Sequence, residues 1–274
     1  MTTVLVTGAT DGLGRAVAGR LARDGADVVL HGRSEERLAA AAGELERATG
    51  TRPRTVRADL ASLAEVRDLA AEVRETLPAL DVLVNNAGIG AGLPDLTTRQ
   101  ESRDGIELRF AVNHLAGFLL TLELLPLLRA SAPARVVHVA SAGQAPVDFD
   151  DPLVEHGYSG PRAYGQSKLA QIACGFELAA RVPGAEVAVT SLHPGTYMPT
   201  KIVLEEIGRS VDTLESGTDA VTRLAVAPEL AGVTGRYFDR TTPSAPHPQA
   251  TDPEARRRRW ELSVRLTGAP EPPA

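Results

Sequence analysis

A tyrosine and a lysine four residues apart, Tyr164 and Lys168, are the residues of this sequence best suited to acid–base chemistry. Apolar residues around them, among them Ala163, Leu169 and Ile172, predict a helix, on which positions four apart share a face. A phenol ionises at about pH 10, and a neighbouring ammonium favours the phenolate. We therefore expect Lys168 to lower the pKa of Tyr164, which would let the tyrosine act as a general acid or base.

The lysine itself is unusual in this composition. The chain has 29 basic residues, and only Lys168 and Lys201 are lysines. Lysine offers a compact point charge with rotatable donors, whereas arginine offers a wide planar fork. A lysine at this position therefore favours a chemical role, although a surface pair that merely shares a helix face is an ordinary alternative.

Composition limits the class of protein. A length of 274 residues with 43% hydrophobic residues allows one large α/β domain, and a net charge of −6 argues against nucleic acid as a partner. The chain enters an apolar strand at residues 3–6 without a leader, and its longest apolar stretch, 118–128, is too short to span a bilayer. We expect a cytoplasmic protein that does not bind a membrane.

Other chemistry-bearing residues carry weaker signals. The six histidines lack metal-ligand spacing, so no metal site is expected, and the single cysteine, Cys174, is expected to pack in the core. Asp148, Asp150 and Asp151 indicate a solvated acidic loop. The arginine run 256–259 beside Trp260 is interpreted as one exposed helical turn rather than a contact to nucleic acid.

Apolar strands alternate with amphipathic helices along the whole chain, which predicts an α/β fold. Strands are expected at 3–6, 27–30, 55–56, 81–84, 135–140, 186–192 and 235–238. Helices are expected at 13–23, 35–48, 63–77 behind a Ser62 cap, 105–128, 161–182 and 219–226. This order indicates a single doubly wound parallel sheet, the Rossmann fold, with helices on both faces. We expect one domain over residues 1–267 and a disordered proline-rich tail at 268–274, which includes Pro273.

Three long loops follow the carboxyl ends of predicted strands, at 86–103, 141–162 and 195–211. In open α/β sheets ligands bind at this edge. The third loop contains the apolar residues Met198, Ile202, Val203, Leu204 and Ile207. It is predicted to be a lid over an apolar substrate, and a helix that simply packs on the sheet is an equal alternative.

A glycine-rich turn joins the first strand to the first helix. Glycines there allow a tight turn and let backbone N–H groups approach a pyrophosphate. The spacing is G-x-x-x-G-x-G, and its position in a βαβ unit indicates a nucleotide site. Its candidate cofactor-binding residues are Thr7, Gly8, Thr10, Asp11, Gly12, Leu13, Gly14 and Arg15.

The end of the second strand indicates which dinucleotide is bound. An acid about 20 residues past the glycines would hold the ribose of NAD, but Gly32 and Arg33 stand there instead. Arg33 can pair with a 2′-phosphate, and Arg15 could add a second positive charge. The charges therefore favour NADP(H), with NAD(H) possible; alternatively Arg33 pairs with Glu35 or Glu36 on the surface.

These residues together resemble the short-chain dehydrogenase/reductase family over residues 3–267. The resemblance rests on motifs that occur in the family's order: the turn 7–14, Asp59-Leu60, Asn85-Asn86-Ala87-Gly88, Asn113, Ser141, Tyr164 and Lys168. By this resemblance Asp59 and Leu60 contact the adenine, and Asn86, Ala87 and Gly88 border the cofactor. The implied catalytic residues are Asn113, Ser141, Tyr164 and Lys168, and the last two also bind cofactor.

Finer features resemble the retinol-dehydrogenase-like branch of that family. Ser141 and Tyr164 are 23 residues apart, and Pro194, Gly195 and Thr196 match a further cofactor-binding motif. Pro199 occupies the position of the threonine that holds the nicotinamide carboxamide in the family. Thr196 or Thr200 is left to make that contact.

The resemblance implies an enzyme that interconverts a carbonyl and an alcohol on a lipophilic small molecule by hydride transfer, with Tyr164 as general acid/base. It also implies a homo-oligomer paired through the helices at 105–128 and 161–182. A catalytically silent NADP(H)-binding regulator on the same fold, and an epimerase or enone reductase, are the alternatives.

Overall fold

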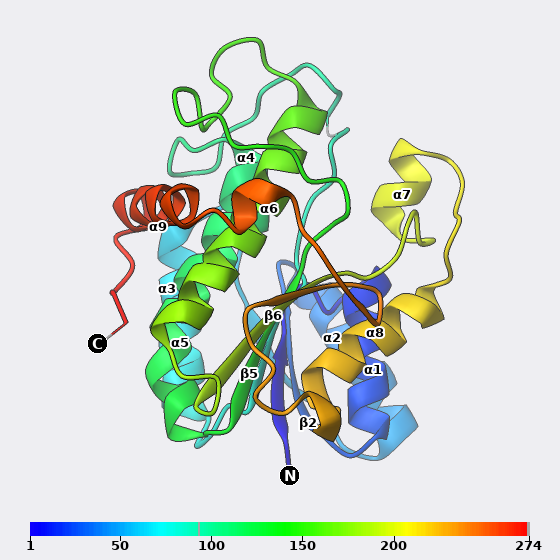
Figure 1. Cartoon of the computed structure of the whole chain (residues 1–274). Coiled ribbons are helices and arrows are strands. Elements are labelled where there is room, and N and C mark those ends of the chain that lie inside the picture. Colours follow the sequence, from blue (N-terminus) through cyan, green and yellow to red (C-terminus); the bar gives the residue numbers. More distant parts are fainter. Residues whose placement is uncertain (93, 273–274) are drawn as a thin grey trace.

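The computed structural model describes residues 1–92 and 94–272. Over this part of the chain one eight-stranded sheet has the order β3-β2-β1-β4-β5-β6-β7-β8, with helices on both faces (Figure 1). Strands β1 to β7 pair in parallel, and β8 adds an antiparallel edge to β7. The predicted doubly wound Rossmann fold is confirmed, and the antiparallel edge strand is an addition to it.

The elements follow the predicted order closely. The strands are β1 Thr3–Val6, β2 Asp27–Gly32, β3 Arg54–Arg57, β4 Val82–Asn85, β5 Ala134–Val139, β6 Val187–His193, β7 Arg236–Asp239 and β8 Thr242–Ser244. The helices are α1 Gly12–Arg23, α2 Glu35–Thr49, α3 Leu63–Thr76, α4 Leu108–Phe110, α5 Ala116–Ala130, α6 Gly160–Arg181, α7 Lys201–Glu206, α8 Leu214–Val226 and α9 Pro253–Thr267.

Local sequence explains where these helices begin. Asp11, Ser34 and Ser62 each accept a backbone N–H at the start of α1, α2 and α3, so the predicted Ser62 cap is confirmed. The central strands are apolar along their length because helices cover both faces of the sheet. Helices α1, α2 and α8 pack on one face of the sheet, α3, α5 and α6 pack on the other, and α9 lies outside α6 and packs against it (Figure 1).

The predicted helix 105–128 is interrupted where it meets the site. Gly105 has φ +74°, the helix begins only at Leu108, and a π-helical turn, Ala111–Leu115, separates α4 from α5. Such turns frequently occur at functional sites. By length and hydropathy the stretch Leu108–Ala130 could cross a bilayer, but 72% of its apolar window is buried, as in the core helix of a globular domain.

The interpretation of residues 256–259 as an exposed turn is wrong for its last residue. These residues belong to α9, in which Arg259 and Trp260 are both buried. The Trp260 ring meets Phe118 of α5 edge-on at 5.0 Å, and Arg181 of α6 lies 4.4 Å from its centroid. Helix α9 thus packs against α5 and α6, the two helices through which pairing of subunits was predicted.

Two predicted loops contain more structure than expected. The tail at 268–274 is packed at its start, since Gly268 caps α9 and Ala269 is buried, while Pro273 and Ala274 lie outside the described residues. The segment 195–211, predicted to be a lid, contains the short helix α7, which stands at the same end of the sheet as the loops after β4 and β5 (Figure 1).

Candidate active site

A cavity of about 550 Å³ lies at the carboxyl ends of strands β1 to β4. Its walls come from the segments after β1, β2, β3 and β4, and from the start of α7. The lining residues are Gly8, Thr10, Asp11, Gly12, Leu13, Gly14, His31, Gly32, Arg33, Ser34, Arg37, Ala58, Asp59, Leu60, Ala61, Asn86, Ala87, Gly88, Ile89, Leu108, Val112, Thr200, Lys201 and Ile202. Most of the predicted cofactor-binding residues are therefore brought together in one cavity large enough for a dinucleotide.

The glycine-rich turn has the geometry that its sequence predicts. Gly8 and Gly12 have φ of +67° and +50°, values that side chains disfavour. A Cβ on Gly14 would overlap the carbonyl oxygen of Gly8, so the helix can approach the strand only with glycine there. The turn therefore leaves the cavity open to a phosphate group.

Thr7 fixes this turn to the neighbouring strand. Its hydroxyl accepts the backbone N–H of Asn86 at 2.9 Å and that of Ala87 at 3.0 Å. The Asn86 amide in turn donates to the Thr7 carbonyl at 2.8 Å. Thr7 is thus a supporting residue whose side chain holds two walls of the cavity at a fixed separation.

The positive charges at the cavity are not entirely those predicted. Arg33 lines it as expected, and Arg37, four residues later in the first turn of α2, lines it too and pairs with Asp11 at 2.7 Å. Arg15 instead forms an ion pair with Glu44 of α2 and is not among the described residues lining the cavity. Because Arg33 precedes the Ser34 cap of α2, no helical spacing in the sequence linked Arg37 to it.

The segment after β6 contributes one of the two candidate threonines. Thr200 lines the cavity, with its methyl carbon 3.3 Å from the position of a Cβ on Gly12. Thr196 is held elsewhere, by its backbone N–H to Asp212 at 2.6 Å and its hydroxyl to His193 at 3.1 Å. Among the described residues, the predicted Pro194, Gly195 and Thr196 are not part of the lining.

The four predicted catalytic residues meet at the ends of β4 and β5. The Ser141 hydroxyl hydrogen-bonds the Tyr164 side chain. A Cβ on Gly143 would lie 3.4 Å from Ser141 Oγ and 3.7 Å from Tyr164 Cε1. A second glycine joins this group to the cofactor cavity: a Cβ on Gly88 would lie 3.1 Å from Asn113 Oδ1 and 3.5 Å from Lys168 Nζ.

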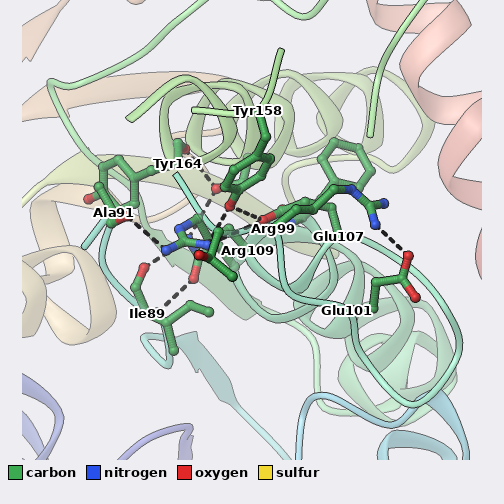
Figure 2. Close-up of polar contacts among 12 residues, drawn as sticks. Ile89, Ala91, Arg99, Glu101, Glu107, Arg109, Tyr158 and Tyr164 are labelled. Carbon is green, nitrogen blue, oxygen red and sulfur yellow. Dashed lines mark hydrogen bonds and ion pairs between the residues drawn. The ribbon is translucent and has the colours of Figure 1, made fainter. Parts of the chain in front are cut away.

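Asn113 is held in one orientation by the π-helical turn. Its Oδ1 accepts the backbone N–H of Ile89 at 2.8 Å, and its Nδ2 donates to the Ile89 carbonyl and to Ser167 Oγ, both at 3.1 Å. The Ser167 hydroxyl donates to the Tyr164 carbonyl at 2.7 Å. Figure 2 shows Ile89 and Tyr164 within this connected set of polar contacts. We refer to Asn113, Ser141, Tyr164 and Lys168 as the catalytic corner.

The electrostatics of the catalytic corner differ from the sequence prediction. Burial raises the pKa of Tyr164, the Ser141 hydrogen bond opposes that change, and Glu206 reinforces it. The expectation that Lys168 lowers this pKa is wrong for the observed arrangement. Lys168 donates to the Val139 carbonyl at 3.0 Å, and its own burial lowers its pKa to about 8. A lysine with that pKa can exchange its proton near neutral pH.

Three buried side chains next to the catalytic corner, two histidines and a cysteine, are uncharged near neutral pH. Burial lowers the pKa of His114 to about 3 and that of His138 to about 4, and it raises the pKa of Cys174 to about 12. The prediction that Cys174 packs in the core is confirmed. Within residues 1–92 and 94–272, no three His, Cys, Asp or Glu side chains gather as metal ligands would.

Comparison with known proteins gives a consistent family. A family model described as short chain dehydrogenase matches residues 2–207. Human retinol dehydrogenase 13 is 39% identical over 98% of this chain and 86% of its own length. A protein from Streptomyces sp. (strain C5), provisionally named daunorubicin C-13 ketoreductase DnrU, is 39% identical over 97% of this chain and 92% of its own.

The solved structures agree with these relatives. Pseudomonas aeruginosa RhlG, solved as an active-site complex with NADP, is 31% identical, with a TM-score of 0.69 over 87% of this chain and 94% of that one. The chain belongs to the short-chain dehydrogenase family, and it is an oxidoreductase.

Proposed function

We propose that this oxidoreductase uses NADP(H) to interconvert a ketone or aldehyde and the corresponding alcohol. One observation carries the proposal. Asn113, Ser141 and the Tyr164/Lys168 pair of α6 come from three separate segments yet meet at one point, and Gly88 connects that point to a cavity of dinucleotide size. A hydroxyl pair beside a buried amine is the arrangement that protonation of a carbonyl oxygen requires.

In the direction of carbonyl reduction, each side chain of the catalytic corner has a separate role. Bound in the cavity, NADPH would supply a hydride to the carbonyl carbon. Ser141 and Tyr164 hydrogen-bond the carbonyl oxygen and stabilise the negative charge that develops on it. Tyr164 then donates its proton to that oxygen, and Lys168 and Asn113 support the return of a proton to the phenolate. Alcohol oxidation is the same sequence reversed.

The preference for NADP(H) over NAD(H) is supported by charge. Arg33 and Arg37 both line the cavity at the end of β2, where an acid would favour the free 2′-hydroxyl of NAD. Arginine pairs with a phosphate through two parallel N–H groups. The NADP bound to the structural relative RhlG agrees with this preference.

The substrate class is proposed from the lid. Leu204, Ile207 and Val211 are exposed on the segment that carries α7, and Leu96 is exposed on the loop after β4. Apolar side chains in these positions suit a lipophilic carbonyl compound or alcohol. Two relatives are named as a retinol dehydrogenase and as a daunorubicin C-13 ketoreductase. We further propose a cytoplasmic protein without nucleic acid or membrane partners.

A screen of carbonyl compounds tests the proposal. The purified chain is incubated with NADPH or NADH and with matched apolar and polar ketones and aldehydes, and NAD(P)H absorbance is followed. We expect turnover of apolar carbonyl compounds, with NADPH favoured over NADH. Cofactor binding without turnover of any compound in either direction would support a silent regulator instead.

A further inference from the structure

A buried ion pair lies next to the loop that follows β4. Arg109 and Glu107 are 0% and 1% exposed, and their side chains lie 3.4 Å apart. The Tyr158 hydroxyl joins them, since it donates to Glu107 Oε1 at 2.9 Å and accepts from Arg109 at 2.5 Å. Figure 2 shows the three side chains converging. None of them belongs to the catalytic corner.

The guanidinium of Arg109 holds the backbone of the loop after β4. Its Nε donates to the Gly90 carbonyl at 2.9 Å, and a terminal nitrogen donates to the Ala91 carbonyl at 2.8 Å. Asn113, one helical turn later, binds both backbone groups of Ile89. Residues 89–91 are thus fixed from below by two side chains four positions apart.

The lid contacts an overlapping part of this loop, residues 90–92. Glu206, at the end of α7, accepts the backbone N–H of Ala91 at 3.1 Å. A Cβ on Gly90 would overlap the Glu206 carboxylate, and a Cβ on Gly92 would lie 2.9 Å from its Cγ. The loop is therefore shaped to receive this side chain, and the carboxylate is near enough to raise the pKa of Tyr164.

The start of the catalytic helix adds a third contact. Tyr158 lies two residues before α6, and a Cβ on Gly160 would overlap the Ala91 carbonyl oxygen. The hydroxyl of Tyr158 remains protonated, because burial and Glu107 raise its pKa to about 12. The Ala91 peptide is consequently confined by α6, by Arg109 and by the lid.

We propose that Arg109 is a positioning residue that sets the closed position of the lid by fixing the Gly90 and Ala91 peptides on which Glu206 docks. A planar fork can bind two adjacent carbonyls and a carboxylate together, whereas a lysine ammonium on a flexible stem cannot hold that set in one plane. Arg109 therefore acts on substrate through α7 and not by contact with the reacting atoms. The kinetic part of this inference rests on the proposed function.

A double-mutant cycle tests the coupling. Arg109→Lys and Glu206→Ala are each expected to raise KM for the carbonyl substrate about fivefold or more, with a smaller change in NADPH affinity. If both act through the Ala91 contact, the double variant should be no worse than the poorer single variant. Multiplication of the two effects would overturn the proposal.

Matched controls separate positioning from general damage. Arg259 is also buried and donates to a backbone carbonyl, that of Gln249 at 3.0 Å, but it lies on α9. Arg259→Lys should leave KM within twofold. Glu205→Ala, which removes the exposed neighbour of Glu206, should do the same. Equal KM changes in Arg109→Lys and Arg259→Lys would contradict the proposal.

Hydrogen exchange provides a readout that does not depend on turnover. In Arg109→Lys the α7 amides should exchange at least fivefold faster than in the wild type, and in Arg259→Lys they should not. If Arg109→Lys fails to fold, Tyr158→Phe removes only the hydroxyl link and should show the same change at smaller size. Unchanged α7 exchange would refute the inference, whereas absence of carbonyl turnover with faster exchange would refute only the proposed function.

Discussion

The cofactor cavity and the catalytic corner lie side by side but are built in different ways. The cavity includes the glycine-rich turn, and its arginines, Arg33 and Arg37, are exposed. In the catalytic corner Asn113 and Lys168 are withdrawn from water, at 1% and 5% exposure, while Ser141 and Tyr164 are half-buried. In the cavity, solvent screens the charged side chains. In the catalytic corner, burial shifts the pKa values of the ionisable side chains.

This difference determines how each region should respond to change. Exposed charges are screened, and each contributes little to stability. Buried polar groups must each keep a partner, as the contacts of Asn113 and Arg109 show, and loss of one partner leaves another unsatisfied. Changes to the buried groups should therefore have larger effects than changes to the exposed charges.

The largest expected effect is loss of stability in mild acid. The pKa values of His31, His114 and His138 are lowered by burial to about 4, 3 and 4. Below pH ~6.5 the unfolded chain binds protons that the folded chain does not, so stability is present above that pH and is lost as pH falls toward 4. Each histidine should reduce stability by about 1 kcal/mol between pH 7 and pH 5.5, or by about 3 to 4 kcal/mol in total.

Urea unfolding at the two pH values measures this loss. His156→Gln supplies the control, because this side chain is 88% exposed and the loss of stability between the two pH values should persist without it. An NMR titration of the folded protein in which His138 ionises near its ordinary pKa would show that the region behind the corner is not desolvated.

A smaller effect is expected from Arg33→Ala at the cofactor cavity. A charge-assisted contact to the 2′-phosphate contributes about 2 kcal/mol, so NADPH affinity should fall about 30-fold. NADH affinity should change less than about threefold, because NADH lacks that phosphate. Fluorescence titration at two salt concentrations measures both, and the NADPH effect should shrink at high salt. Equal losses of affinity for NADPH and NADH would show that Arg33 does not bind the 2′-phosphate.

The smallest effect is expected from Arg15→Ala. Arg15 pairs with Glu44, and both side chains are nearly half exposed. Such a pair contributes at most about 0.5 kcal/mol to stability, and NADPH affinity should change less than about twofold. Thermal unfolding and the same titration check both values. A loss of NADPH affinity as large as that of Arg33→Ala would restore the role that the sequence suggested for this residue.

The parts that the sequence predicted well are those specified locally. The glycine turn, Arg33 and the Tyr164/Lys168 pair each lie within one short segment, and the alternation of apolar strands and helices specified the Rossmann sheet. Arg37 was missed because its place at the cavity depends on where α2 packs. The choice between Thr196 and Thr200 stayed open in the sequence because it depends on where α7 packs. The Lys168 effect on Tyr164 was misjudged because spacing along a helix does not reveal desolvation or the Val139 carbonyl that binds the ammonium.

The hydrogen bonds from Arg109 to the loop after β4 could not have been predicted from the sequence. Its contacts to Gly90, Ala91 and Tyr158 join positions 18 to 49 residues apart, and no periodicity brings them together. A buried arginine also looks in sequence like any of the other 26 arginines. Only tertiary packing distinguishes it.

Transfer of deuterium from labelled NADPH tests the central claim most directly. NADPH deuterated at the transferable C4 position is mixed with the best carbonyl substrate, and the product is examined by mass spectrometry for the wild type and for Tyr164→Phe. We expect one deuterium on the carbinol carbon with the wild type, and formation on the order of 10³-fold slower with Tyr164→Phe at unchanged NADPH affinity. A Tyr164→Phe rate within tenfold of the wild type, or a product without deuterium, would contradict the account.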